Sequence, residues 1–188
     1  DITGATNYVP TETVTEGTAY TAPVLSKTGY TFIGWFTDAA CTTAYVPAAN
    51  PITANATLYA KFAGEATVTN VAMSADGTKV LLTFNKKMAD PTGNQNQFAV
   101  NVGGNPVGIT GAMLNNIDDK IIELTLSSAA IFDTVTISYT NGTIATADGG
   151  KAQYFDNIAL TNIRFEAEDA TIFGANIENS MTASHGKD

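Results

Sequence analysis

Three acidic side chains near the end of the sequence have types and spacing that could do chemistry: Glu166, Glu168 and Asp169. Residues two apart on a strand lie on the same face, so Glu166 and Glu168 could bind one calcium ion. Calcium takes about six to eight oxygen ligands, and two glutamates supply only a fraction of them, so this segment alone should bind weakly. A glycosidase pair would need two carboxyls across a formed cleft. We therefore expect no catalytic residues here.

Other acidic clusters are explained as turns. Asp76-Gly77, Asp118-Asp119 and Asp148-Gly149-Gly150 combine residues that bond their own backbone with glycines that supply a positive φ. A metal site would require several of these turns to converge, and the sequence alone does not show such convergence.

His185 and Cys41 are each the only residue of their type. A nucleophilic Ser-His pair needs a buried and oriented imidazole, and His185, beside Ser184 at the end of the sequence, is interpreted as a solvated residue. Cys41 has no second cysteine for a disulfide or a metal site, so we interpret it as a small packing residue.

The aromatic residues of the first third allow two interpretations. They could form a platform on which sugar rings stack, or they could be the core of a module of about sixty residues, which must bury most of its large side chains to fold. We favour the core. Strict alternation would place Tyr30, Phe32 and Gly34 on one face of a strand and Thr31, Ile33 and Trp35 on the other, with one row partly exposed.

Composition sets the fold class and excludes several partners. Of 188 residues, 29 are threonine and only 14% are charged, which favours strands over helices. The formal charge of -9 makes nucleic acid and anionic membrane surfaces poor partners, whereas neutral glycans remain compatible. No apolar run approaches the roughly 18 residues of a membrane-spanning helix. No signal peptide is visible at Asp1, which we interpret as a cut rather than a natural start.

The strand pattern predicts an all-β chain in three parts: residues 1–63, 64–162 and 163–188. Residues 13–20 are interpreted as a strand or an extended arm broken by a glycine turn. The spacing of the later strands predicts a β-sandwich of immunoglobulin-like plan. The main predicted strands are residues 29–36, 58–62, 67–73, 79–84, 98–102, 121–126 and 134–139.

Residues 29–38, Gly-Tyr-Thr-Phe-Ile-Gly-Trp-Phe-Thr-Asp, together with Leu-Tyr-Ala-Lys-Phe at 58–62, resemble the Listeria-Bacteroides repeat. This family implies a small β-grasp-like module, found in strings along bacterial cell-surface and secreted proteins. Its members open with a short strand that is missing from, or trimmed from, this sequence. The resemblance covers about a third of the chain.

The second part resembles another family, the bacterial immunoglobulin-like repeats of the SwmB type. The resemblance rests on residues 76–88, on residues 135–140 and on Ala-Asp-Gly-Gly at 147–150. The family implies a structural spacer in a long extracellular protein.

Residues 163–174, Ile-Arg-Phe-Glu-Ala-Glu-Asp-Ala-Thr-Ile-Phe-Gly, resemble the opening strand of a family 6 carbohydrate-binding module. In that family early glutamates help to hold a structural calcium, so the resemblance implies this role for Glu166 and Glu168 in a complete module. The sequence contains only about a fifth of such a module.

These observations predict non-catalytic spacer modules, without a cofactor of their own, from a larger secreted or cell-surface bacterial protein that acts on polysaccharides. The parent would be a glycoside hydrolase or a related enzyme. The partners would be neighbouring domains of the same polypeptide, and polysaccharide through the incomplete third module. The stalk of a surface adhesin is the alternative, and an enzyme activity of the chain itself is the least favoured hypothesis.

Overall fold

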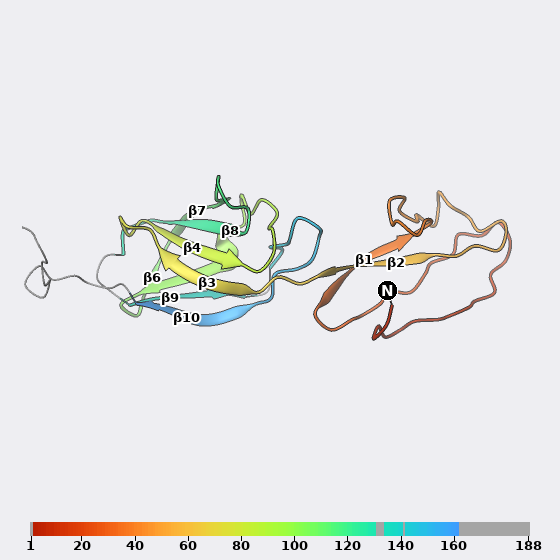
Figure 1. The fold of residues 1–188 in the computed structure, drawn as a ribbon, viewed down its shortest axis with the longest axis horizontal. Helices are drawn as coiled ribbons and strands as arrows, with labels where there is room; N and C mark the ends of the chain where they lie inside the picture. The colour runs from red at the N-terminus through yellow and green to blue at the C-terminus, as the bar shows by residue number, and fades with distance from the viewer. Residues whose placement is uncertain (1, 131–133, 141, 162–188) are drawn as a thin grey trace, which may run out of the picture.

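The structure is a computed structural model that describes residues 2–130, 134–140 and 142–161. Figure 1 shows two bodies joined end to end along the long axis of the molecule. We call residues 2–64 the first module and the described residues from 65 to 161 the second module. All regular elements in these ranges are β-strands, apart from one 3-10 turn at Gln95–Gln97, so the predicted all-β fold is confirmed. None of the described residues forms a helix long and apolar enough to cross a membrane.

The first module is built on one antiparallel pair of strands, β1 (Tyr30–Phe36) and β2 (Tyr59–Gly64). The rest of the module runs in extended loops held by isolated bridges, some between loops and two to β1. Residues 13–20 form the extended arm and not a regular strand, with a turn at Gly17 and a bridge between Thr18 and Ile52.

The predicted alternation along β1 is wrong after Phe32. Phe32 pairs with Phe62 whereas Gly34 pairs with Lys61, so Ile33 is an extra residue in a β-bulge. Gly34 has a φ of 146°, which other residues rarely adopt. The bulge returns Trp35 to the side of Phe32, and their ring centroids lie 5.8 Å apart with the rings edge to face.

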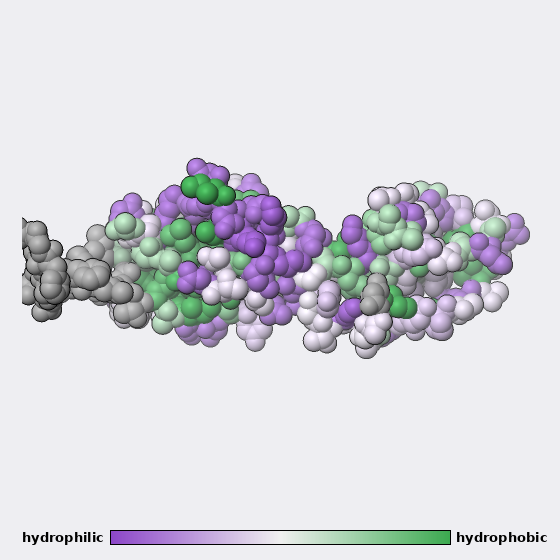
Figure 2. Space-filling model, viewed as in Figure 1, coloured by the Kyte–Doolittle hydropathy of each residue, from purple (hydrophilic) through white to green (hydrophobic). Residues whose placement is uncertain are grey.

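The first module has a small core. Its buried hydrophobic residues are Leu25, Phe36, Tyr45 and Ala63. The rings of Phe32 and Phe62 pack together at 5.4 Å, but both are only half-buried, and Tyr30 is 44% exposed. The aromatic residues are therefore partly core and partly surface. The exposed side chains of β1, Tyr30 and Ile33, come from both of the predicted rows and do not form a single exposed row. Figure 2 shows a surface of mostly intermediate hydropathy on this module, in contrast to the strongly hydrophilic residues gathered on the second.

The second module is the predicted β-sandwich, made of two four-stranded antiparallel sheets (Figure 1). One sheet has the order β3-β4-β8-β7 and the other β10-β9-β5-β6. A cluster of eighteen buried side chains fills the space between them. The strands are β3 (Val68–Met73), β4 (Lys79–Phe84), β5 (Phe98–Val102), β6 (Asn105–Val107), β7 (Ile109–Leu114), β8 (Ile121–Leu126), β9 (Thr134–Tyr139) and β10 (Phe155–Thr161).

Period-two alternation builds this core. Along β9, Val135, Ile137 and Tyr139 all point inward and are at most 1% exposed, as the sequence predicts. Tyr139 also packs between Phe98 and Phe155, with ring centroids 5.2 Å and 6.0 Å away. Its buried hydroxyl accepts a hydrogen bond from the backbone N–H of Ile144 at 3.2 Å.

We predict that Tyr139→Phe destabilises the second module by about 1–3 kcal/mol, because the buried N–H of Ile144 loses its acceptor while the ring packing stays. Urea unfolding followed by far-UV circular dichroism measures this change. Tyr154→Phe is the matched control, since Tyr154 is 74% exposed. Equal stability of the two variants would contradict the assigned role of the Tyr139 hydroxyl.

Candidate functional site

The residues predicted to hold calcium, Glu166 and Glu168, lie outside the described residues, as do Asp169 and His185. Their predicted roles therefore stay predictions. Within the described ranges no group of three or more His, Cys, Asp or Glu residues is placed to hold a metal ion.

The acidic clusters inside the described ranges form turns. Asp76 accepts hydrogen bonds from the hydroxyl of Ser74 at 2.6 Å and from Thr78, and Gly77 has a positive φ of 69°. These bonds, chiefly that from Ser74, lower the pKa of Asp76 to about 2. Asp118 accepts a hydrogen bond from the backbone N–H of Lys120 in the same manner.

Cys41 lies in the turn that follows β1. It has a positive φ of 53° and is half-buried. The turn is closed by Asp38, whose carbonyl accepts from the Cys41 N–H and whose carboxylate accepts from the backbone of Thr42 and Thr43. Cys41 therefore contributes to this turn through its left-handed backbone conformation as well as through its small side chain.

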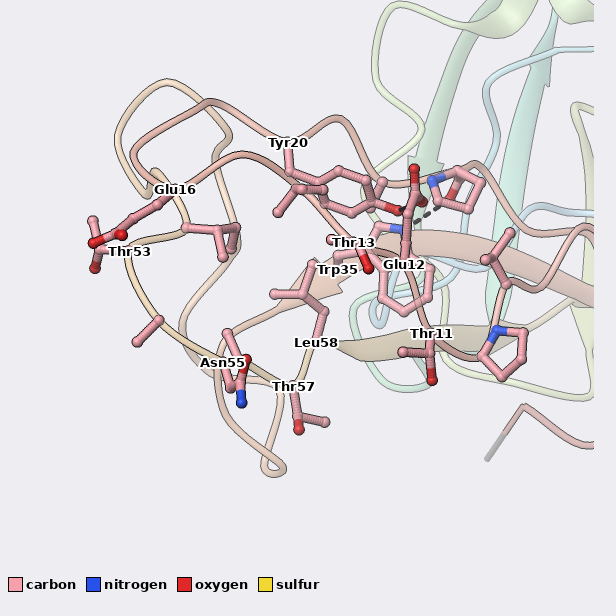
Figure 3. Close-up of a pocket in the computed structure, with 18 of the residues that line it drawn as sticks. Thr11, Glu12, Thr13, Glu16, Tyr20, Trp35, Thr53, Asn55, Thr57 and Leu58 are labelled. Carbon is pink, nitrogen blue, oxygen red and sulfur yellow. Dashed lines mark hydrogen bonds between the residues drawn. The ribbon is translucent and has the colours of Figure 1, made fainter.

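A cavity of about 710 Å³ lies in the first module, between residues 8–16 and residues 52–58. Figure 3 shows Glu12, Tyr20 and Trp35 grouped together, with Glu16 towards the opposite end. The cavity runs beside the segment that leads into β2, which is an edge strand of its sheet. Within the described part of the chain, residues 59–63 make backbone–backbone hydrogen bonds only with β1.

Two polar side chains of this cavity, those of Tyr20 and Trp35, already donate hydrogen bonds to other lining residues. The Tyr20 hydroxyl donates to Glu12 Oε2 at 2.5 Å, and this bond, with a smaller effect of burial, raises the pKa of Tyr20 to about 12. The Trp35 Nε1–H donates to the carbonyl of Pro23 at 2.7 Å. Two carboxylates and no cation line the cavity. A tyrosine with a pKa this high is a poor general acid or base near neutral pH.

A second arrangement lies where the two modules meet, and we call it the junction: residues 64–67, Thr31, residues 85–86 and residues 146–153. Every backbone N–H from residue 65 to residue 67 donates a hydrogen bond. Glu65 donates to the carbonyl of Gly29 at 3.0 Å, and Ala66 donates to that of Lys151 at 2.9 Å.

The next steps of the connection are also paired. Gln153 donates to the carbonyl of Ala66 at 2.8 Å, and Thr67 exchanges hydrogen bonds with Asn85. Ala66 is completely buried and forms a parallel bridge with Ala152. The connection is therefore part of the folded structure and not a free linker.

Lys86 joins the two modules through its ammonium group. Its Nζ donates to the carbonyl of Gly64 at 2.9 Å and forms an ion pair with Asp148 Oδ2 at 3.0 Å. Asp148 also accepts a short hydrogen bond from the hydroxyl of buried Thr146. The bond from Thr146 lowers the pKa of Asp148, and Lys86 lowers it further.

The two glycines after Asp148 fit against the first module for different reasons. Gly149 has a positive φ of 90°, as a turn requires. At Gly150 a Cβ would lie 2.1 Å from the carbonyl oxygen of Gly64, so only glycine leaves room for the connection. The N–H of the following residue, Lys151, donates to the hydroxyl of Thr31 at 2.8 Å. The turn interpretation of residues 148–150 was therefore right but incomplete, because this turn also contacts the first module.

Each module matches the family model of a repeat domain. Residues 1–61 match the family model of the Listeria-Bacteroides repeat domain, and residues 53–144 match that of a "Putative flagellar system-associated repeat". These matches confirm the resemblances of the first two parts. Both are repeat domains typical of surface-associated bacterial proteins. Neither model extends over residues 163–188.

Solved structures with a similar arrangement include the N-terminal part of the bacterial S-layer protein SbsC, at 16% identity and a TM-score of 0.42. That match covers 52% of this chain and 23% of the other. Domains 1–6 of surface layer protein SbsC match at 17% identity and a TM-score of 0.42, over 50% of this chain and 13% of the other. The chain thus spans less than a quarter of these proteins. No curated protein matches it.

We predict that the Asp148 carboxyl titrates below its ordinary pKa of 3.8, and that Thr146→Val raises this pKa more than Lys86→Met does, because Thr146 makes the larger contribution. A folded-state pKa below the unfolded value stabilises the fold above the unfolded pKa. This contribution is lost as the pH falls through the folded pKa.

Carbon-detected NMR titration of the side-chain carboxyls measures both pKa values. Asp76 is the internal reference, since its own turn at the β3–β4 connection should not respond to either substitution. An ordinary Asp148 pKa in the unsubstituted protein would contradict the hydrogen-bond pattern of the junction.

Proposed function

We propose that the two modules act as a non-catalytic spacer that holds a fixed distance and direction within a larger bacterial surface protein. The observation that carries the proposal is that every backbone N–H of residues 65–67 donates a hydrogen bond, the first to one module and the next two to the other. A flexible linker allows a wide range of distances between the domains it joins, whereas a connection bonded into both domains does not. The end-to-end arrangement in Figure 1 gives such a unit length.

We also propose that this segment has no catalytic activity. The cavity of the first module supports this, because Tyr20 and Trp35 already bond neighbouring groups and the carboxylates have no cationic or imidazole partner among the lining residues. General acid–base catalysis usually relies on a group whose pKa lies near the working pH.

The finer proposal concerns the parent protein. We propose that it is secreted or attached to the cell surface and acts on polysaccharides, with Glu166 and Glu168 contributing to a calcium site in a complete third module. This rests on the sequence resemblance of residues 163–174 to a carbohydrate-binding module. The partners would be neighbouring domains and, through the third module, polysaccharide.

One observation favours the alternative of an adhesin stalk. Several large hydrophobic side chains of the first module are exposed, including Val24 at 73%, Tyr30 at 44% and Tyr59 at 37%. Aromatic residues at a surface often contribute strongly to protein–protein binding. An adhesin would use these residues to contact another protein.

We predict a single narrow distance between the modules. Spin labels at Tyr59→Cys and Asn116→Cys, in a Cys41→Ser background, report this distance by double electron–electron resonance. Insertion of Gly-Ser-Gly-Ser between Glu65 and Ala66 is the control and should broaden the distribution. A broad distribution without the insertion would rule out the rigid spacer.

We further predict that the purified chain neither binds nor degrades polysaccharides. Pull-down on insoluble glycans and an assay for newly formed reducing ends test the two parts. Retention on one glycan that is lost in Trp35→Ala would instead assign a sugar-binding role to the cavity. Release of reducing ends would establish an enzyme.

A further inference from the structure

We propose that the second module is the template on which the first module folds, so that the first module stays folded only while docked through the junction. This inference rests on the same junction as the spacer proposal, but it concerns the stability of the first module and not the distance between the modules. The two proposals can therefore fail independently.

The difference between the two cores supports this direction of dependence. The first module buries four hydrophobic side chains, whereas the second contains a single cluster of eighteen. A two-stranded sheet is at best marginally stable in water without a hydrophobic face packed on something else. In the described residues, the first module thus has far fewer buried contacts of its own than the second.

The junction contacts both strands of the first module at the same end of its sheet. Thr31 of β1 accepts the hydrogen bond from Lys151, and Gly64 at the end of β2 accepts the one from Lys86. In the β1–β2 register, Thr31 pairs with Ala63, the residue next to Gly64. Docking therefore fixes the two strand ends relative to each other and sets the register of the pair.

Apolar packing adds to these hydrogen bonds. Ile33, the extra residue of the β1 bulge, reaches towards the turn of the second module, and a Cβ at Gly149 would lie 3.0 Å from its Cδ1. Ala63 of β2 is 3% exposed, and Ala66, just beyond the strand, is completely buried. The best-buried part of β2 is thus the end that meets the second module.

Trp35 allows the stability of the first module to be measured separately. It is the only tryptophan of the sequence and lies in β1, so its fluorescence follows the first module. NMR signals from the methyl groups of Ile122 and Leu124, both completely buried in the sandwich, follow the second. Both probes can be recorded on the full chain in one urea series.

The first test removes the ammonium group that bonds Gly64. In Lys86→Met we expect a lower urea midpoint for Trp35 fluorescence and a nearly unchanged midpoint for the methyl signals. The second module should change much less, because the Lys86–Asp148 pair is partly exposed, at 29% and 57%, and such pairs contribute little to stability. Lys87→Met is the matched control, since Lys87 pairs with Asp119 and not with Gly64. Equal Trp35 midpoints in the two variants would overturn the proposal.

The second test weakens the template. Ile137→Ala removes a buried side chain of β9 and should lower the methyl midpoint. The Trp35 transition must then occur at or below this new midpoint. Leu25→Ala, in the core of the first module, should lower the Trp35 midpoint alone. Folded Trp35 fluorescence at urea concentrations that unfold the sandwich would overturn the proposal, even if the distance between the modules in the native protein is fixed.

Discussion

The arrangement of the two modules depends on two consecutive residues of the connection, Glu65 and Ala66, whose backbone N–H groups bond the first and the second module respectively. Ala66 has no exposed surface, so water cannot reach its backbone groups, and a buried peptide group without a partner is costly. Its N–H donates to the carbonyl of Lys151 and its carbonyl accepts from Gln153, so this residue is held by the second module. The preceding residue, Glu65, donates to the carbonyl of Gly29 in the first module, and a change in the angle between the modules would strain this bond.

The backbones of the two modules approach closely at Gly150 because this residue has no side chain. At Gly150 a Cβ would collide with the Gly64 carbonyl, so the approach of the backbones depends on glycine for space and not for an unusual φ. The Gly64 carbonyl then accepts its hydrogen bond from Lys86, whose ammonium is also held by Asp148. The Gly64 carbonyl at the end of β2 thus contacts both the loop at Gly150 and the Lys86–Asp148 ion pair.

These details explain what the sequence could predict. Alternation in residues 134–139 predicted the inward face of β9, because burial on one face leaves a period of two. The same rule failed in β1, since a bulge at Ile33 shifts the period and only the glycine beside it marks the place. The acidic turn at residues 148–150 was predicted from its local chemistry. The contact of this turn with Gly64 was not predicted, because Gly64 is distant in the sequence. In a sequence, a glycine needed for a close contact cannot be told from a glycine needed for a turn.

The two ends of the first module differ in how their backbone is paired, and this decides which end holds order. Near the junction, the backbone is hydrogen-bonded to the second module: the carbonyl of Gly29 accepts from Glu65, and the carbonyl of Gly64 accepts from Lys86. At the far end, the cavity separates residues 8–16 from residues 52–58, and few backbone bonds join them. Local stability follows the density of such bonds and of buried contacts. Order should therefore decrease with distance from the sandwich, which places the fixed reference point of the unit in the second module.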